Sequence, residues 1–183
     1  MNYKDFKIQF VGLKDGVHNF VFKINKTFFD LFKYSELTEG ELTAKVQMNK
    51  SESMLIFDTE ITGTVSLPCD YCLEQYNQEL QISNQTYVKF GEEYDEPDDN
   101  LIIIDRNDTI FDIGNLIYQL IVVNLPLKRN HPLDKDGNLT CNSEILDKIE
   151  DILVFENKSE EEREENLNSN WKNELKKLKN GTS

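Results

Sequence analysis

Three cysteines and one histidine are the residues of this chain best suited to chemistry. Cys69 and Cys72 form a Cys-x-x-Cys pair, and His131 and Cys141 follow much later in the sequence. A Cys-x-x-Cys turn presents two thiolates to one tetrahedral ion, and a structural zinc ion takes four ligands of the Cys or His type. The four residues are therefore a candidate site for one structural zinc ion.

Two other interpretations of these residues stay open. In the first, Cys69 and Cys72 are small buried thiols at a turn, Cys141 is a surface residue and His131 is unrelated to them. In the second, Cys69 and Cys72 are a thioredoxin-type redox pair, although such a pair opens a helix after a parallel strand and this one lies between segments typical of antiparallel strands. The nine-residue spacing between His131 and Cys141 also lacks the compact form of a zinc ribbon.

No motif for enzymatic catalysis accompanies these residues. The chain has neither a glycine-rich phosphate loop nor a Gly-x-Ser-x-Gly elbow, and its eight glycines are scattered singly. An arrangement of nucleophile, base and acid would have to use one of the two histidines, His18 or His131. We expect His18 to lie on the surface of a strand, opposite the neighbouring phenylalanines. The sequence therefore predicts no catalytic residue and no enzymatic activity.

A second candidate binding element lies near the C-terminus. Apolar residues recur there at helical spacing and form one stripe, while lysines cover the other side. This short amphipathic basic helix either docks on its own domain or is laid into a groove of a partner, and its lysines are the one route to RNA phosphate. The residues assigned to partner binding are Trp171, Lys172, Leu175, Lys176, Lys177 and Leu178.

The elements that must position these residues are mostly strands. Apolar and polar residues alternate in the segments 6–10 and 18–24, which predicts a β-hairpin. Mixed apolar spacing predicts a short helix over Thr27–Leu37. Further apolar patterns predict strands over the segments 42–48, 54–67, 79–90 and 101–104. Because short turns join most of them, consecutive strands should pair as antiparallel neighbours.

Two helices and one loop complete the predicted scaffold. Asp112 caps a largely apolar core helix, which runs to about Asn124 before Pro126 stops it. Six acids and a proline in residues 92–99 predict a mobile, solvated loop. Helical spacing predicts a second short helix over Glu144–Val154.

The predicted fold class is α+β. It combines a mostly antiparallel, curved sheet with one core helix, a second short helix and a flexible C-terminal tail. Residues 1–156 form a single domain, and residues 157–183 form the charged tail. The zinc interpretation also requires the turn at Cys69 to lie beside the loop that follows the core helix.

Composition limits the functions open to such a domain. The chain has 183 residues and a formal net charge of −14. This negative charge repels a phosphate backbone and suits a basic protein partner. The alternative is that the acidity serves solubility alone. No apolar run is long enough to span a bilayer, and the N-terminus lacks the apolar region of a signal peptide. Three cysteines also suit reduced thiols or metal ligands better than a disulfide framework. The sequence therefore predicts an acidic cytoplasmic protein that binds macromolecular partners and no membrane.

Several short motifs resemble those of the YceD-like family, the bacterial and plastid proteins associated with accumulation of large-subunit ribosomal RNA. The resembling residues are Gly63-Thr64-Val65, Cys69-Asp70-Tyr71-Cys72-Leu73-Glu74, Phe111-Asp112-Ile113, Leu125-Pro126, His131, Cys141 and the closing Trp171, Leu175, Lys176, Lys177 and Leu178. The Asn- and Lys-rich composition and the His-Pro-x-Asp-x-x-Gly stretch are similar to a Bacteroidetes-type member.

The resemblance implies a non-catalytic ribosome-biogenesis factor that supports accumulation of large-subunit ribosomal RNA. We expect such a factor to bind a basic ribosomal protein, another assembly factor or a pre-ribosomal particle, with RNA contacted only through the basic tail. The alternative is a thiol-redox or zinc-handling protein centred on Cys69 and Cys72.

Overall fold

The computed structural model describes residues 3–33, 35–132, 135, 140–141 and 145. The chain divides into two compact units, Met1–Asn130 and His131–Ser183, and the elements below belong to the first. The domain boundary predicted near residue 157 and the basic helix predicted in the tail lie outside the described residues. The helix predicted over Glu144–Val154 lies outside them too, apart from Ile145.

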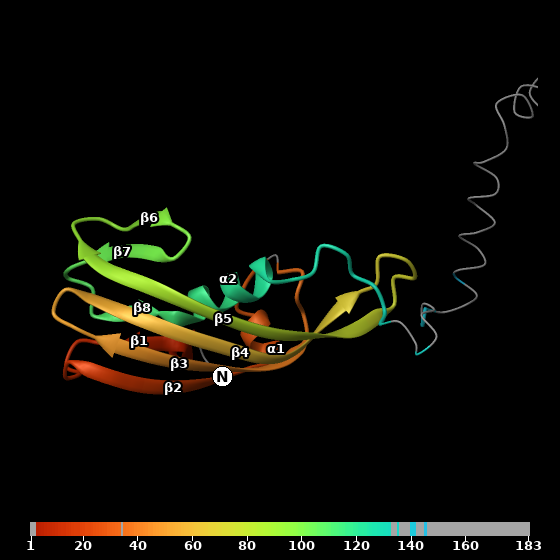
Figure 1. The fold of residues 1–183 in the computed structure, drawn as a ribbon, viewed down its shortest axis with the longest axis horizontal. Coiled ribbons are helices and arrows are strands. Elements are labelled where there is room, and N and C mark those ends of the chain that lie inside the picture. Colours follow the sequence, from red (N-terminus) through yellow and green to blue (C-terminus); the bar gives the residue numbers. More distant parts are fainter. Residues whose placement is uncertain (1–2, 34, 133–134, 136–139, 142–144, 146–183) are drawn as a thin grey trace, which may run out of the picture. The chain divides into compact units, whose positions relative to one another are not determined.

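The first unit is built on a six-stranded sheet with the strand order β2-β3-β4-β5-β7-β6 (Figure 1). Neighbouring strands pair antiparallel, except that β5 and β7 are parallel. β1 and β8 form a separate two-stranded antiparallel sheet. The strands are β1 (Lys7–Gln9), β2 (Gly16–Ile24), β3 (Gly40–Lys50), β4 (Met54–Pro68), β5 (Gln75–Gly91), β6 (Asp95–Asp98), β7 (Leu101–Asp105) and β8 (Ile110–Asp112). The predicted mostly antiparallel sheet is confirmed.

In the described part of the chain, three short helices accompany the sheet. They are the 3-10 helix η1 (Tyr3–Phe6) and the α-helices α1 (Lys26–Phe29) and α2 (Ile113–Val123). As predicted, the side chain of Asp112 caps α2, because it accepts a hydrogen bond from the Asn115 N–H at 3.1 Å. No helix among the described residues is both long and apolar enough to cross a membrane.

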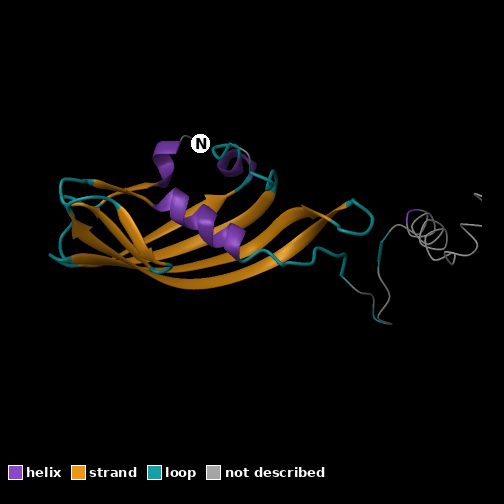
Figure 2. Cartoon of the chain, turned by 90° about the horizontal axis from the view of Figure 1, so that it is seen from above, coloured by secondary structure: helices purple, strands orange, loops and turns teal. Residues whose placement is uncertain are grey.

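The core lies between α2 and the face of the sheet that α2 covers (Figure 2). Residues of β4 alternate between this buried face and an outer face, so the predicted two-residue period is confirmed. Its phase is wrong in the first half of the strand, where Leu55 and Phe57 are buried and the predicted Met54 and Ile56 lie on the outer face. On the helix, Ile113, Ile117 and Ile121 share one face and are all fully buried. Full burial of such a side chain contributes about 1.5–3 kcal/mol. Phe57 of β4 also stacks on Phe111 of β8 with ring centroids 4.7 Å apart, which ties the small sheet to the large one.

The hairpin predicted for residues 6–10 and 18–24 is wrong. β1 pairs with β8, whereas β2 pairs over its full length with β3. The connection passes from one sheet to the other through Gly12 and Gly16, whose φ angles of 96° and 122° favour glycine. His18 also lies on the same half-buried face of β2 as Phe20 and Phe22, not opposite them, and its Nε2 is 2.8 Å from the Lys14 carbonyl oxygen.

Two further local predictions need correction. The helix predicted over Thr27–Leu37 is a single turn, α1, because the N–H groups after its C-cap donate to the carbonyl three residues back, as in 3-10 turns, and not four residues back. Residues 92–99, predicted as a mobile loop, contain the edge strand β6, which pairs with β7. Their predicted exposure is confirmed, since every residue of β6 is exposed. Backbone pairing with β7 therefore orders a segment that buries no apolar side chain.

Gly63 lets β3 and β4 run unusually close together. Its φ is 145°, and a Cβ at this position would lie 2.2 Å from the carbonyl oxygen of Glu41 in β3. Only glycine avoids this collision. Soon after Gly63 the pairing with β3 ends, at Gly40 and Val65, while β4 and β5 stay paired as far as Pro68 and Gln75. The turn that contains Cys69 therefore stands at the tip of a two-stranded ribbon (Figure 1).

Candidate metal centre

Cys69 and Cys72 lie in the tight turn that joins β4 to β5. The Cys69 N–H donates to the Glu74 carbonyl and the Leu73 N–H donates to the Cys69 carbonyl, both at 2.9 Å. Leu73 has a φ of 61°, a left-handed conformation that costs a non-glycine residue about 1–3 kcal/mol. The turn buries both thiols, which are 0% and 2% exposed, whereas Tyr71 and Leu73 are 47% and 76% exposed. The side chains that can bind a metal thus face the protein, and the apolar ones face solvent.

Asp70 fixes a second segment of the chain to this turn. The Arg129 N–H donates to the Asp70 carboxylate at 2.7 Å, and the Arg129 carbonyl accepts from the Asp70 N–H at 2.6 Å. Because Arg129 belongs to the loop that follows α2, these bonds confirm that this loop lies beside the Cys-x-x-Cys turn. His131 comes two residues later on the same chain.

A third segment is fixed at the same point through Glu36. The Arg129 guanidinium donates two hydrogen bonds to the Glu36 carboxylate, each 2.9 Å long, in the forked geometry that suits this pair. These hydrogen bonds lower the pKa of Glu36 and raise the pKa of Arg129. The Glu36 side chain is 53% exposed, so water screens the ion pair and its contribution to stability is small. Its main effect is to fix the direction of the Arg129 side chain.

Charges at the turn act on the nearby Tyr76 phenol. Burial raises the pKa of the Tyr76 phenol, and the charges of the Cys69 thiolate and the Asp70 carboxylate raise it further, while Arg129 lowers it. The phenol therefore stays neutral and adds no further negative charge when the thiols ionise. A cation placed among the sulfurs would offset the repulsion between them.

In the second unit, a hydrogen bond joins the residues next to His131 and Cys141. The Thr140 hydroxyl donates to the Pro132 carbonyl at 2.8 Å. Pro132 directly follows His131 and Thr140 directly precedes Cys141, so this hydrogen bond brings together the two ends of the nine-residue spacing.

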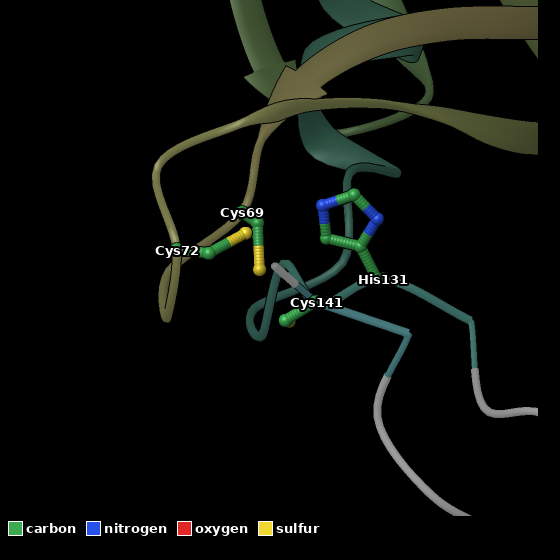
Figure 3. A group of neighbouring side chains, drawn as sticks. All are labelled: Cys69, Cys72, His131 and Cys141. Atoms are coloured by element: carbon green, nitrogen blue, oxygen red, sulfur yellow. The ribbon is translucent and has the colours of Figure 1, made fainter. Parts of the chain in front are cut away.

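The four side chains form one cluster, the candidate metal centre (Figure 3). One ligand atom from each of Cys69, Cys72, His131 and Cys141 lies within 4.8 Å of every other. Around a tetrahedral zinc ion with Zn–S bonds of about 2.3 Å, neighbouring sulfurs lie about 3.8 Å apart, so binding requires movements of about 1 Å. Three thiolates and one imidazole are also a usual ligand set of structural zinc sites. Donor chemistry and spacing both fit the ion.

This geometry weighs on the interpretations that the sequence left open. The cluster favours the zinc interpretation over the one in which His131 is unrelated to the cysteines, and Cys141 is half-buried instead of exposed. The Cys-x-x-Cys turn joins two antiparallel strands and opens no helix, unlike a thioredoxin-type pair. The tail residues assigned to partner binding lie outside the described residues.

Sequence reasoning missed Glu36 and Arg129. They are 93 residues apart in the sequence, and neither belongs to a motif. Isolated charged residues in loops carry no signal that one will meet the other. Asp70 lay within the Cys-x-x-Cys motif, but its hydrogen bonds to Arg129 also depend on the tertiary fold.

A comparison with protein-family models gives a match over more than half of the chain. The family described as large ribosomal RNA subunit accumulation protein YceD matches residues 57–179, which include all four members of the cluster. No curated protein and no solved structure matches the chain. The assignment to a Bacteroidetes-type member stays a prediction, because the family match does not address it.

Proposed function

The chain belongs to the YceD family, which implies a role in accumulation of large-subunit ribosomal RNA, and from this premise we propose that it is a non-catalytic ribosome-biogenesis factor. It acts by binding a basic ribosomal protein or another assembly partner. The family match over residues 57–179 is the observation that carries this proposal.

The distribution of charge supports a basic partner. Residues 51–183 carry 12 Lys or Arg and 28 Asp or Glu, a net charge of −16, whereas residues 1–50 carry 8 and 6, a net charge of +2. The excess acid thus falls in the part of the chain that contains the family match. Complementary potentials speed association with a basic protein and oppose contact with RNA phosphates.

Depletion of the protein in its own cells tests this function. We expect the ratio of large- to small-subunit ribosomal RNA to fall, and the tagged protein to co-sediment with pre-ribosomal particles. An unchanged ratio together with no co-sedimentation would overturn the proposal.

The cluster of Cys69, Cys72, His131 and Cys141 supports a structural zinc ion as part of this function. Such an ion would hold the turn at the tip of the ribbon, with its exposed Tyr71, in one conformation for a partner. The second candidate function, thiol-redox or zinc-handling work, uses the same side chains differently. Thiol titration separates the two: a structural site keeps its metal and its thiols unreactive, whereas redox work requires a reversible disulfide in metal-free protein.

A further inference from the structure

A small groove lies between β7, β8 and the start of α2, and none of its lining residues belongs to the candidate metal centre. Its volume is about 280 Å³, and side chains of all three elements line it. The floor consists of four buried apolar side chains, Ile102, Ile104, Phe111 and Leu116. At the rim, Ile110 leaves 47% of its surface exposed. An apolar side chain that enters this groove would therefore be removed from water.

The walls of the groove carry only negative charge. Glu96, Asp108 and Asp112 line it, and no Lys, Arg or His is among the lining residues. Asp112 is engaged as the cap of α2, and Glu96 accepts a hydrogen bond from the Tyr94 hydroxyl. None of the ion pairs found in the described part of the chain includes Glu96 or Asp108. Both carboxylates can accept a cation from outside.

The edge strand β6 extends this negative surface beyond the groove. Residues 92–99, which include β6, contain six acids and no base, and all of them are exposed. Positive charge occurs in the adjoining hollow that shares Asp108, where Lys50 and Arg106 are found. Lys50 is already paired with Asp15 at 2.6 Å. The potential over the groove is thus set mainly by carboxylates.

We propose that this groove binds a lysine- or arginine-rich segment of a protein partner. The apolar floor receives the aliphatic stems or the apolar neighbours of the basic residues, and the charged ends reach Glu96 and Asp108. The inference rests on the proposed function, because it names the surface that receives the basic partner. A volume of about 280 Å³ is at the lower limit of small-molecule pockets, which span roughly 300–1,000 Å³, and suits a few side chains better than a cofactor.

A labelled peptide of alternating lysine and valine, titrated with the full chain by fluorescence anisotropy, tests the charged contacts. Glu96→Gln combined with Asp108→Asn should weaken binding by roughly tenfold, because each exposed ion pair contributes up to about fivefold in affinity. The matched control is Glu79→Gln combined with Asp30→Asn, which makes the same charge change at exposed positions away from the groove. It should leave the affinity within about twofold.

A second pair of variants tests the apolar contact. Ile110→Ser at the rim should weaken binding by roughly threefold to tenfold, the value of a small buried apolar contact. Val21→Ser, which changes another exposed aliphatic residue in a strand, should have no effect. A peptide with serine in place of valine should no longer distinguish Ile110→Ser from the wild type. Thermal unfolding of each variant verifies that it is folded.

Three outcomes would overturn the inference. Equal losses in the groove and control variants would mean that overall acidity alone attracts the peptide. Binding of single-stranded polyuridylate that the groove variants abolish would assign the groove to RNA. Tighter peptide binding after replacement of the tail lysines 172, 176, 177 and 179 by glutamine would assign it to the chain's own tail.

Complementation separates this inference from the proposed function. If depletion leaves the ribosomal RNA ratio unchanged, the proposed function fails, whatever the peptide binds. If the ratio falls and the Glu96→Gln, Asp108→Asn variant restores it as well as the wild type does, the groove proposal fails and the proposed function stands. Restoration by the control variant alone supports both.

Discussion

The two ends of the β4–β5 hairpin carry opposite kinds of surface. At the tip, the turn from Cys69 to Glu74 buries its polar ligand atoms and exposes Tyr71 and Leu73. At the far end, beyond the pairing of β5 with β7, the groove buries its apolar floor and exposes carboxylates. The tip is held by specific polar contacts between distant segments, whereas the groove is formed by the packing of α2 against strands.

This difference determines which substitutions should change the conformation of each end. The tip extends beyond the pairing with β3 as a two-stranded ribbon, and isolated ribbons are marginally stable. Its conformation therefore depends on the candidate metal centre, on Gly63 and on Arg129. The groove belongs to the main core, so its shape should survive changes at the tip, and its charge should matter for binding more than for folding.

The largest expected effect is loss of the metal from the tip. Protein purified without chelator should contain close to one equivalent of zinc by elemental analysis, and Cys69→Ser should contain none. An ion present at about a thousandfold above its dissociation constant stabilises the folded state by about 4 kcal/mol, so the variant should lose stability of this order. Wild-type protein treated with chelator is the control and should unfold at a similarly reduced temperature. Zinc-free wild type, or a variant that keeps its zinc, would contradict the assignment.

Gly63→Ala should cost somewhat less, about 3 kcal/mol in urea-induced unfolding. The added Cβ would lie 2.2 Å from the Glu41 carbonyl oxygen, in a backbone conformation that alanine rarely adopts. Gly12→Ala is the control, because its Cβ would meet no atom within 4 Å, although its φ is also positive. It should cost only about 1 kcal/mol of backbone strain. Equal losses in the two variants would show that close packing against β3 is not what Gly63 provides.

The sequence predicted which side chains at the tip could bind a metal better than it predicted the contacts that hold the tip in place. Cys69 and Cys72 share a motif, Cys141 is the third cysteine, and His131 is the histidine closer to it in the sequence. The alternation in β4 and the capping Asp112 similarly predicted local elements, because side-chain period and capping are local properties. All of these predictions concern residues close together in the sequence or of a rare type.

Long-range pairing was beyond the sequence patterns. Alternation shows that residues 6–10 form a strand but not that its partner is β8, because many strands offer the same apolar face. The parallel pairing of β5 with β7 and the Glu36–Arg129 ion pair were missed for the same reason. The groove has no motif at all, since its floor and walls come from separate elements that meet only in the folded chain.

Arg129→Lys should have a smaller effect, about 0.5–1 kcal/mol, because lysine cannot donate the paired hydrogen bonds that the guanidinium donates to Glu36. Lys26→Gln is the control, because it removes a single-contact ion pair to Glu39 between two exposed side chains, and it should be neutral within about 0.5 kcal/mol.

The effect of Arg129→Lys should also depend on pH. The folded-state pKa of Glu36 is lowered, so the stabilisation is present above its unfolded-state pKa of about 4.3 and is lost as pH falls through the lower folded value. Unfolding free energies of the two proteins should therefore converge at acidic pH. A gap that persists there would mean that Arg129 acts through packing instead.

The smallest expected effect belongs to the groove end, where Tyr94 reports on the carboxylate beside it. Tyr94 is 62% exposed, but partial desolvation of its phenol, followed by the hydrogen bond to Glu96 and the charge of Glu96, raises the pKa of Tyr94 to about 12. Because the folded-state pKa is raised, the associated stability is present below the unfolded value of about 10 and is lost as pH rises through the folded value.

Glu96→Gln should lower the Tyr94 pKa towards 10 without changing the titration of Tyr76 at the tip, as followed by NMR of ring-labelled tyrosine. Glu79→Gln is the matched control, and an unchanged Tyr94 pKa in Glu96→Gln would mean that burial alone raises it. In that case the Glu96 carboxylate would be free of the phenol and fully available to a basic partner, so the groove would be more strongly acidic than the hydrogen bond suggests.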